Sequence, residues 1–418
     1  MPETTRVLLK DLLIATKDGD WGKSEREDGY VPYSVIRATD FGNVALGNTG
    51  NVPIRYLSAK TVERRTLQID DILIETAGGS PGRPTGRTML VTDRVLSGFS
   101  LPVTCASFAR YMRVDRRLAD PRYIYWYLQS LYQSGAIEQY QVQHTGVARF
   151  QYTNFASTHK VPIIEMREQK AIAEVLGALD DKIAVNVKLA NIADEWIRAE
   201  YDLLTTLSSE HRALSEIVIN RRNTANPEML EAKVPYVGLE HIPRRLMWLG
   251  EHGSSDEVSS NKSHFKAGDI LFGKLRPYFH KIVTAPKAGI CSTDVLVLTP
   301  MDEALSGFAL ASLAHDGVVQ AVTSASEGTR MPRTSWKDLS SINVPWPGHE
   351  AAESFSTRVS AIRDYVIGLM AENQTLAATR DALLPQLMSG KLRVKEAEAL
   401  GESVVQPAVN ASRVPEKF

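Results

Sequence analysis

Basic, phenolic and hydroxyl side chains that could bind phosphate oxygens gather in the segment Gly268–Lys281. Within it Lys274, Arg276 and Tyr278 alternate, and in an extended strand such positions share one face. Two cations and a phenol on one face, followed by Lys281, suit the phosphate contacts by which proteins position a nucleic acid. A solvated strand edge carries Lys and Arg for another reason, which is to avoid pairing with other edges. The segment therefore predicts either a phosphate-binding face or a solvated strand edge.

A loop with two guanidinium groups and three hydroxyls follows at Glu327–Trp336. Arg330 and Arg333 could each bind the edge of a guanine with two hydrogen bonds in a major groove. Thr334 could bind a base or a phosphate. The loop therefore predicts contacts that read bases, and a surface loop with incidental arginines is the alternative.

The first half of the chain carries a corresponding pair, Arg149 and Gln151, in which Gln suits adenine as Arg suits guanine. The run Gly78–Arg87 has the composition of a loop. Its glycines leave little bulk, so Arg83 and Arg87 could approach a duplex closely. We predict DNA contacts at these four side chains as well.

No catalytic constellation accompanies these residues. Gly19–Ser24 ends like a phosphate-binding loop, but the Gly that this motif needs five residues before Gly22 is Lys17. Asn226–Glu228 lacks the continuation of an adenine-methylating motif, and the nine His never cluster at metal-ligand spacing. A catalytic triad assembled across the fold stays open, because sequence adjacency does not exclude it. We expect neither a cofactor nor a metal in this chain.

The composition limits the class of protein. The 418 residues are 43% hydrophobic, and no apolar run is long enough for a membrane span, so no membrane partner is expected. The length suits two or more domains. Met1–Thr5 has no charged-then-apolar leader, and Cys105 and Cys291 lie far apart without His or Cys neighbours. A reducing cytoplasm is the simplest setting.

The net charge of −1 is distributed unevenly along the chain. Residues 1–164 carry 20 Lys and Arg against 16 Asp and Glu, and residues 211–345 carry 15 against 14. Residues 165–210 carry 5 against 10, and residues 346–390 carry 3 against 5. Mild basicity of the first two segments permits local basic patches, which nucleic-acid binding needs, but does not demonstrate them.

Two long helices are expected to position these segments. Between about Glu168 and Leu204, apolar or small residues recur at alternating spacings of four and three, and the pattern recurs 183 residues later. This period predicts helices that pack along a narrow seam, each about 55 Å long if about 37 residues are helical. Asn186 and Asn373 fall on the seam, where an amide sets the register. The predicted seam positions are Ile172, Leu176, Leu179, Ile183, Asn186, Ala190, Ala193, Ile197, Phe355, Val359, Ile362, Val366, Leu369, Asn373, Leu376, Arg380, Leu383 and Leu387.

The globular segments also repeat in order, as the echoes Val31-Pro32-Tyr33 and Val234-Pro235-Tyr236, Asp71-Ile72-Leu73 and Asp269-Ile270-Leu271, and Val161-Pro162 and Val344-Pro345 indicate. We predict strands at the first two echoes and a helix over Pro121–Tyr132 capped by Asp120. The fold class is mixed α/β, of the α+β kind, with two similar domains separated by two antiparallel coiled-coil helices about a pseudo-twofold axis. The predicted divisions are a domain at 1–164, a helix at 165–210, a domain at 211–345, a helix at 346–390 and a loosely ordered tail at 391–418.

The chain resembles the specificity subunits of type I restriction-modification systems over nearly all its length. The residues that carry the resemblance are Gly268–Lys281, Ser292–Asp294, Gly328–Pro332, Val344-Pro345, Arg380–Gly390, Arg167–Ala173 and Leu179–Ile183. Their order and duplication are specific, although no single one is. Gly348–Ala351 departs from the Glu-Gln that usually begins the helix in this family, as Glu168-Gln169 does here, so the start of the second helix stays open.

The resemblance implies two target recognition domains, each reading one half of a split double-stranded DNA sequence. It implies two methylase subunits, which bind S-adenosylmethionine and methylate adenine, and motor-nuclease subunits, which use ATP and Mg²⁺. It also implies that the specificity subunit has no active site of its own. A coiled-coil scaffold whose globular halves bind proteins is the main alternative, and an enzyme with a dispersed site is another.

Overall fold

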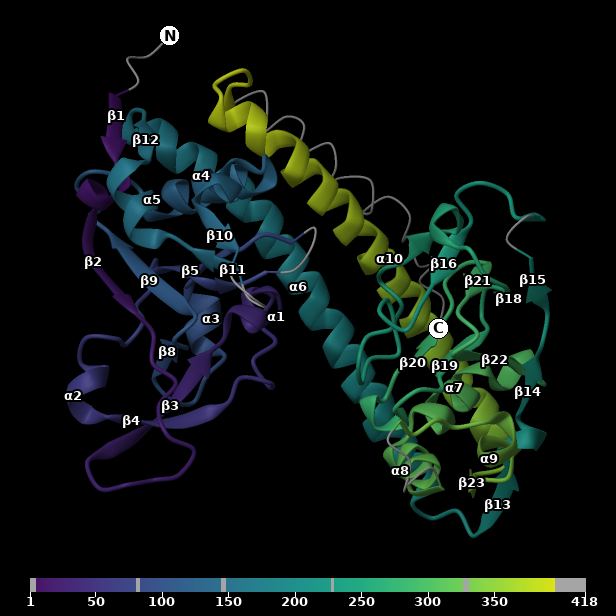
Figure 1. Ribbon diagram of the computed structural model, residues 1–418. Coiled ribbons are helices and arrows are strands. Elements are labelled where there is room, and N and C mark those ends of the chain that lie inside the picture. Colours follow the sequence, from purple (N-terminus) through teal and green to yellow (C-terminus); the bar gives the residue numbers. More distant parts are fainter. Residues whose placement is uncertain (1–4, 80–82, 144–147, 227–228, 326–330, 395–418) are drawn as a thin grey trace, which may run out of the picture. The chain divides into compact units, whose positions relative to one another are not determined.

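The computed structural model describes residues 5–79, 83–143, 148–226, 229–325 and 331–394. The chain divides into two compact units: the first unit holds residues 1–185 and 373–418, and the second unit holds residues 186–372. Each unit combines one β-rich domain with half of each of two long helices, α6 and α10 (Figure 1). The two units are therefore built from the same kinds of part.

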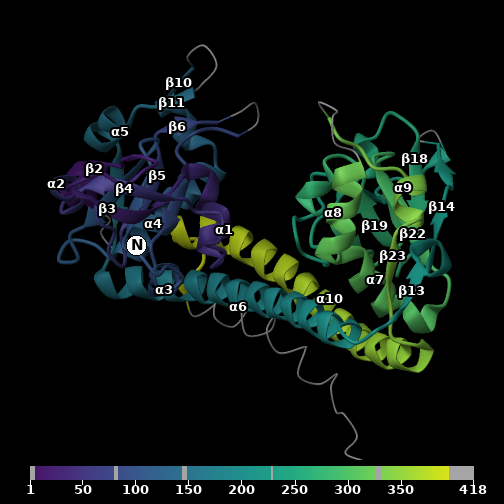
Figure 2. The same cartoon turned by 90° about the horizontal axis from the view of Figure 1, so that it is seen from below.

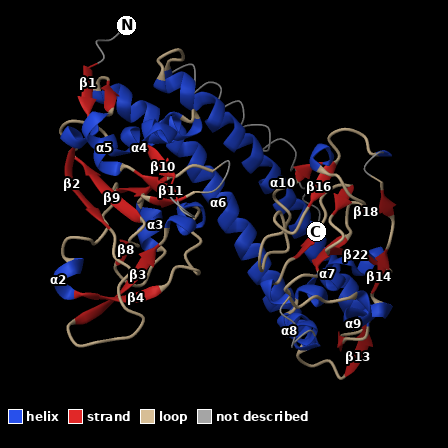
Figure 3. Cartoon of the chain, in the orientation of Figure 1, coloured by secondary structure: helices blue, strands red, loops and turns tan. Residues whose placement is uncertain are grey.

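The domain of the first unit rests on a four-stranded antiparallel sheet of order β2 (Leu13–Asp18), β9 (Ala109–Val114), β5 (Ile72–Glu75) and β7 (Thr88–Leu90). A three-stranded sheet has the order β4 (Ile54–Ser58), β3 (Tyr30–Ile36) and β8 (Val103–Cys105). A second three-stranded sheet has the order β10 (Gln141–Gln143), β11 (Ala148–Phe150) and β6 (Ala77–Gly78). A two-stranded sheet pairs β1 (Thr5–Leu8) with β12 (Lys160–Ile163). Its helices are α1 (Phe41–Ala45), α2 (Ala59–Val62), α3 (Asp93–Ser97), α4 (Pro121–Gln133) and α5 (Tyr152–Thr158) (Figure 3).

The domain of the second unit has a four-stranded sheet of order β14 (Val218–Arg221), β22 (Val295–Pro300), β19 (Ile270–Gly273) and β20 (Ile282–Thr284). A five-stranded sheet has the order β15 (Thr224–Ala225), β18 (Lys262–Phe265), β21 (Gly289–Cys291), β16 (Pro235–Val237) and β17 (Gly253–Ser254), and β13 (Glu210–Ala213) pairs with β23 (Asn343–Trp346). Its helices are α7 (Ser306–Ala314), α8 (Asp316–Ala325) and α9 (Trp336–Ser340).

The two domains follow one plan, because the order β2-β9-β5-β7 in the first corresponds to β14-β22-β19-β20 in the second. Each domain also has one parallel pair, β3 with β8 and β16 with β21. These pairs set Cys105 opposite Ile36 and Cys291 opposite Val237, so the two cysteines occupy equivalent buried positions. The duplication that short sequence echoes predicted is present in the strand topology.

The echoed aspartates explain part of that duplication. Asp71 and Asp269 are both buried, and each accepts a hydrogen bond from the backbone N–H three residues earlier, of Gln68 and Lys266 respectively, at 2.7 Å. Each thus fixes the turn that leads into the central strand of its sheet. In the first unit Asp71 is also paired with Arg113 at 2.7 Å, so its charge is compensated.

Helix α4 begins where the sequence predicted. The carboxylate of Asp120 accepts hydrogen bonds from the backbone N–H groups of Arg122 and Tyr123 at 2.9 and 3.1 Å, and Pro121 occupies the first helical position. The cap satisfies two donors that a helix start leaves unpaired. Tyr123 and Trp126 are buried on the face that the helix turns to the domain.

The long helices run over Met166–Thr205 (α6) and His349–Met388 (α10). Most predicted seam positions are buried, namely Ile172, Leu176, Leu179, Ile183, Asn186, Ala190, Ile197, Phe355, Val359, Val366, Leu369, Leu376, Leu383 and Leu387. In the first unit Arg380 pairs with Asp180 at 2.5 Å, and in the second Arg358 lies 3.5 Å from Glu200. The early part of each helix thus packs on the late part of the other, as antiparallel partners do. The predicted fold class, two β-rich domains with two long packed helices, is confirmed.

Polar groups on the seam are held by partners. Burial raises the pKa of the Asp180 carboxyl, although the neighbouring Arg380 charge opposes the shift. The Asn186 side chain is buried, and its Nδ2 donates to Glu372 Oε2 at 2.7 Å within the second unit. A buried amide with a fixed partner restricts the register of the helix pair. Helix α10 begins at His349, a start that the sequence left open. The predicted domain limits stay predictions, and the tail from residue 395 lies outside the described residues.

Candidate functional site

In the first unit, one small sheet holds the Gly-rich run and the segment of Arg149 together. Strand β11 pairs with β10 on one side and with β6 on the other, setting Arg149 opposite Val142 and Ala77 (Figure 2). Arg149 and Arg83 are exposed, as DNA contacts require. Residues 80–82 and 144–147, which complete the two loops, lie outside the described residues.

Gln151 is exposed directly after β11. Its backbone N–H donates to the carbonyl of Tyr140 at 2.8 Å, and its side-chain Oε1 accepts a hydrogen bond from Asn154 Nδ2 at 3.4 Å. The backbone is thus fixed while the side-chain contact is long and weak. The amide of Gln151 is available to a ligand at little cost.

Arg87 differs from Arg83 because its guanidinium is already engaged. Its Nε and Nη2 donate to the two carboxylate oxygens of Glu75 at 3.0 and 2.7 Å, and the Glu75 side chain is 3% exposed. A bidentate pair of this kind holds the arginine rigidly. Gly78 is required beside it, because a Cβ there would lie 2.4 Å from Glu75 Oε1. Arg87 is therefore a fixed group at the side of a site, whereas Arg83 is free to extend.

In the second unit, the expectation that Lys274, Arg276 and Tyr278 share the face of a strand is wrong. Strand β19 ends at Gly273, and Pro277–Phe279 form one turn of 3-10 helix. Arg276 adopts a left-handed conformation with φ of 51°. Pro277 is responsible in part, since it has no N–H to donate to a sheet and its ring fixes φ. The segment turns where the alternation of side chains suggested extension.

The same turn brings both predicted segments of the second unit together. The Arg276 N–H donates to the Pro332 carbonyl at 2.8 Å, and the Thr334 N–H donates to the Lys274 carbonyl at 3.0 Å. Arg333 lies between them and pairs with Asp294 at 2.7 Å. Residues far apart in sequence therefore form one basic surface, with Arg276 and Arg333 exposed.

The remaining candidates of the second unit are less accessible than predicted. Lys274 Nζ donates to the carbonyl of Thr293 at 2.5 Å, and burial, with the Arg333 charge nearby, lowers the Lys274 pKa. Lys281 Nζ donates to the carbonyl of Leu239, and burial lowers the pKa of its ammonium as well. The ammonium groups of both lysines are therefore already hydrogen-bonded to backbone carbonyls of the domain.

Thr334 and Tyr278 differ from each other in how accessible their side chains are. Thr334 is buried, and its hydroxyl has no hydrogen-bond partner among the described residues. Tyr278 is 49% exposed, and the exposed Arg244 lies 3.7 Å above the neighbouring Phe279 ring. Arg244 was not predicted, since the pair Arg244-Arg245 belongs to no motif that the sequence analysis recognised. Arg330 lies outside the described residues.

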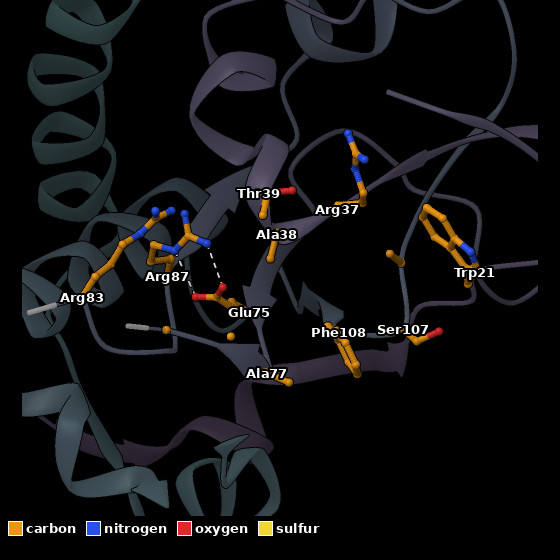
Figure 4. Close-up of a pocket in the computed structure, with 13 residues that line it drawn as sticks. Trp21, Arg37, Ala38, Thr39, Glu75, Ala77, Arg83, Arg87, Ser107 and Phe108 are labelled. Carbon is orange, nitrogen blue, oxygen red and sulfur yellow. Dashed lines mark hydrogen bonds and ion pairs between the residues drawn. The ribbon is translucent and has the colours of Figure 1, made fainter. Parts of the chain in front are cut away.

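A cavity of about 730 Å³ opens in the first unit beside the Gly-rich run (Figure 4). It is lined by Trp21, Arg37, Ala38, Thr39, Glu75, Ala77, Gly78, Gly79, Arg83, Arg87, Ala106, Ser107 and Phe108. Sequence reasoning missed it because its aromatic residues, Trp21 and Phe108, belong to no motif and come from distant parts of the chain. The predicted residues Arg83 and Arg87 stand at its edge.

Backbone pairing identifies the residues of the second unit that correspond to Glu75 and Arg87 of this cavity. The Glu75 N–H donates to the Arg87 carbonyl, and the Gly273 N–H donates to the Lys281 carbonyl, each at 2.8 Å. Glu75 thus corresponds to Gly273, and Arg87 to Lys281. Around Gly273 the space is filled: a Cβ there would lie 3.0 Å from Leu239 Cδ2 and 3.2 Å from Lys281 Cβ.

Within the described ranges, no three His, Cys, Asp or Glu side chains are grouped so that they could hold a metal ion. The two cysteines are buried, and burial raises the pKa of each thiol to about 12. None of the described helices is both long and apolar enough to span a membrane.

Comparisons with known proteins agree on one family, although no family model matches the chain. The chain is 20% identical over 416 residues to the "Putative type I restriction enzyme MjaX specificity subunit" of Methanocaldococcus jannaschii, an alignment that covers 93% of each protein. It is 24% identical over 187 residues to the "Type I restriction enzyme EcoDI specificity subunit" of Escherichia coli, covering 43% of this chain but only 37% of that protein.

The fold has a solved counterpart. The type I restriction-modification S subunit from M. genitalium superposes with a TM-score of 0.54 at 16% identity, covering 92% of this chain and 96% of that one. This match shows that the chain shares the fold of that subunit, and both curated relatives are named as type I specificity subunits.

Proposed function

We propose that this specificity subunit reads a bipartite target in double-stranded DNA, one half-site with each domain, and directs adenine methylation or cleavage by partner subunits. The repeated strand order carries the proposal, because two copies of one plan supply two similar reading surfaces. Each copy exposes arginines, Arg83 and Arg149 in the first unit and Arg276 and Arg333 in the second.

Positioning and readout fall to different residues. Arg276 follows a strand end and has no carboxylate partner among the residues that the structure describes, so it suits a phosphate. Arg333 and Arg149 are exposed and could reach a major groove, where arginine binds guanine with two hydrogen bonds. Gln151 suits adenine in the same way. Arg330 completes the second loop in this proposal, and Lys274, Lys281 and Thr334 support the surface from beneath.

The partners in this proposal are two methylase subunits, which bind S-adenosylmethionine, and motor-nuclease subunits, which use ATP and Mg²⁺ in the cytoplasm. Support for a helical partner comes from α6, where Leu189, Ile192, Trp196 and Leu203 are exposed at spacings of three, four and seven. Such a stripe fits the apolar face of another helix. The chain itself carries no active site and binds no cofactor in this account, and it acts through the enzymes that it recruits.

Methylome sequencing of the host with and without this gene tests the proposal. Loss of one bipartite adenine-methylation motif is the expected result, and the motif would give both half-sites. Retention of every methylated motif in a host that expresses the subunit would reject the function.

The scaffold alternative makes a different prediction about salt. A protein that neutralises phosphates loses DNA affinity steeply as salt rises, because bound counterions are released. A scaffold that binds proteins through its domains would bind DNA without sequence preference. Affinity for target and non-target duplexes, measured over a salt series, separates the two.

A further inference from the structure

The cavity of the first unit has the size and composition of a ligand site. Its volume of about 730 Å³ falls within the range of about 300–1,000 Å³ usual for small-molecule pockets. Its lining is mainly small or apolar, and Glu75, Arg83 and Arg87 lie together at one side (Figure 4). A mainly apolar wall with a few fixed polar groups is the usual form of a site for a flat heterocycle.

The polar floor of the cavity is built with fixed geometry. Glu75 is 2% exposed and accepts two hydrogen bonds from Arg87, at 2.7 and 3.0 Å. Gly78 leaves the space that this carboxylate occupies. A carboxylate has about four lone-pair sites, so two remain for a ligand. The acceptor oxygens of Glu75 and the guanidinium of Arg87 therefore lie side by side at one wall of the cavity.

The other walls suit an aromatic ring. Phe108 is 61% exposed and Trp21 is 38% exposed, although both line the cavity. Exposed aromatic side chains at a concave site are platforms on which bases stack. Arg83 at the edge adds positive charge, which a DNA backbone would meet, whereas the Arg37 guanidinium is paired with the Asp40 carboxylate at 2.8 and 2.9 Å.

We propose that this cavity accepts a nucleobase rotated out of the duplex, and that the base carries an exocyclic amino group. The inference rests on the proposed function, since it requires DNA at the loops that flank the cavity. The amino group donates to Glu75, an acceptor on the base faces Arg87, and the ring stacks on Phe108. Thymine has no exocyclic amino group: its N3–H is its one donor on the pairing edge, and the carbonyl oxygens on both sides of it would be repelled by the carboxylate.

The second unit lacks the polar wall at the equivalent position. Gly273 stands there in place of Glu75, and a Cβ on it would lie 3.0 Å from Leu239 Cδ2 and 3.2 Å from Lys281 Cβ. The base site is therefore proposed only for the half-site that the first unit reads. This asymmetry supplies a control within the same molecule.

The test is an orphan-base scan with the full chain in complex with its methylase partner. The base opposite each position of the first half-site is removed in turn, because an unpaired base costs less to extrude. We expect one position at which removal tightens binding about tenfold. The gain is lost with Phe108→Ala and with Glu75→Gln, and it is lost again when that position carries thymine.

Two further variants keep the result interpretable. Ser107→Trp fills the cavity from an exposed rim position and should abolish the gain even if Glu75→Gln fails to fold. Tyr278→Ala removes an exposed aromatic ring from the second unit and should leave the gain intact. If binding tightens at the methylated adenine and this gain is unchanged by Phe108→Ala, we attribute the gain to the partner enzyme.

Specific binding with no position whose gain depends on Phe108 would overturn the base site and leave the proposed function standing. Absence of sequence-specific binding by the wild-type complex would instead reject the proposed function. A Phe108-dependent gain that persists in Ser107→Trp would also overturn the site, because the base would then lie outside the cavity.

Discussion

At the end of strand β5 the first unit buries Glu75 against Arg87, whereas at the equivalent end of β19 the second unit has Gly273 beside Lys281. The first arrangement leaves an open cavity with a charged floor, and the second is packed with the side chains of Leu239 and Lys281. The strand order around the two positions is the same. One scaffold can thus carry two different surfaces, as a protein that reads two unlike half-sites requires.

The largest expected difference between the two positions is in stability. Arg87→Ala leaves Glu75 buried without its partner and should cost about 3–5 kcal/mol of unfolding free energy in the first unit. Lys281→Ala removes one hydrogen bond from a half-buried ammonium and should cost about 1 kcal/mol. Native-state amide exchange reports the opening of each domain separately. Equal losses in the two variants would contradict the assigned difference.

Acid should weaken the second unit through His280. Burial and the neighbouring Arg198 lower the His280 pKa to about 4, below its ordinary value of 6.5. The unfolded chain therefore gains a proton as pH falls below about 6.5 while the folded unit does not, so stability is full above that pH and is lost toward pH 4. The expected loss between pH 7 and pH 5 is about 2 kcal/mol.

Urea unfolding at the two pH values measures this loss. His159 in the first unit also has a lowered pKa, because of burial and Arg6, so the wild-type protein carries a second acid-sensitive group. The matched control is His280→Gln, which should remove most of the pH dependence of the second unit. An unchanged pH dependence in that variant would reject the role of His280.

Specificity should separate by unit. Arg333→Ala should cost about 1–3 kcal/mol at one position of one half-site, because a bidentate guanine contact is lost. Arg149→Ala should do the same in the other half-site only. Binding to duplexes with single base changes in each half-site measures both. If either substitution relaxes both half-sites, the division of reading between the units is wrong.

The smallest effect is expected at Arg276, which is exposed on the turn after β19. Arg276→Ala should weaken binding to every sequence alike and reduce the salt slope by about one. Lys274→Ala should change the slope less, because its ammonium already donates to the Thr293 carbonyl. A change in sequence preference with either variant would assign that residue to base readout instead.

The architecture was predictable because it depends on periodicity. The seam from Ile172 to Ile197 repeats every 3.5 residues, and burial of that seam follows directly. The echoed Asp71 and Asp269 were likewise recognisable, because a short local turn needs each of them. Local patterns therefore gave the helices, the duplication and the cap at Asp120.

The site was less predictable because it depends on long-range pairing. The alternation of Lys274, Arg276 and Tyr278 predicted an extended strand, but the chain turns at Pro277. The hydrogen bond between Arg276 and Pro332 is seen only in the structure. Trp21, Glu75 and Phe108 are separated along the chain and share no spacing. All three line one cavity only once the sheets of the domain have formed, and sequence patterns do not specify that long-range pairing.

The central claim, that each domain reads one half-site independently, is tested by replacing residues 211–345 with a second copy of residues 1–164 and mapping the methylated motif of the resulting complex. The predicted motif contains the first half-site twice and no trace of the second. Persistence of the original second half-site in an active complex would contradict the claim.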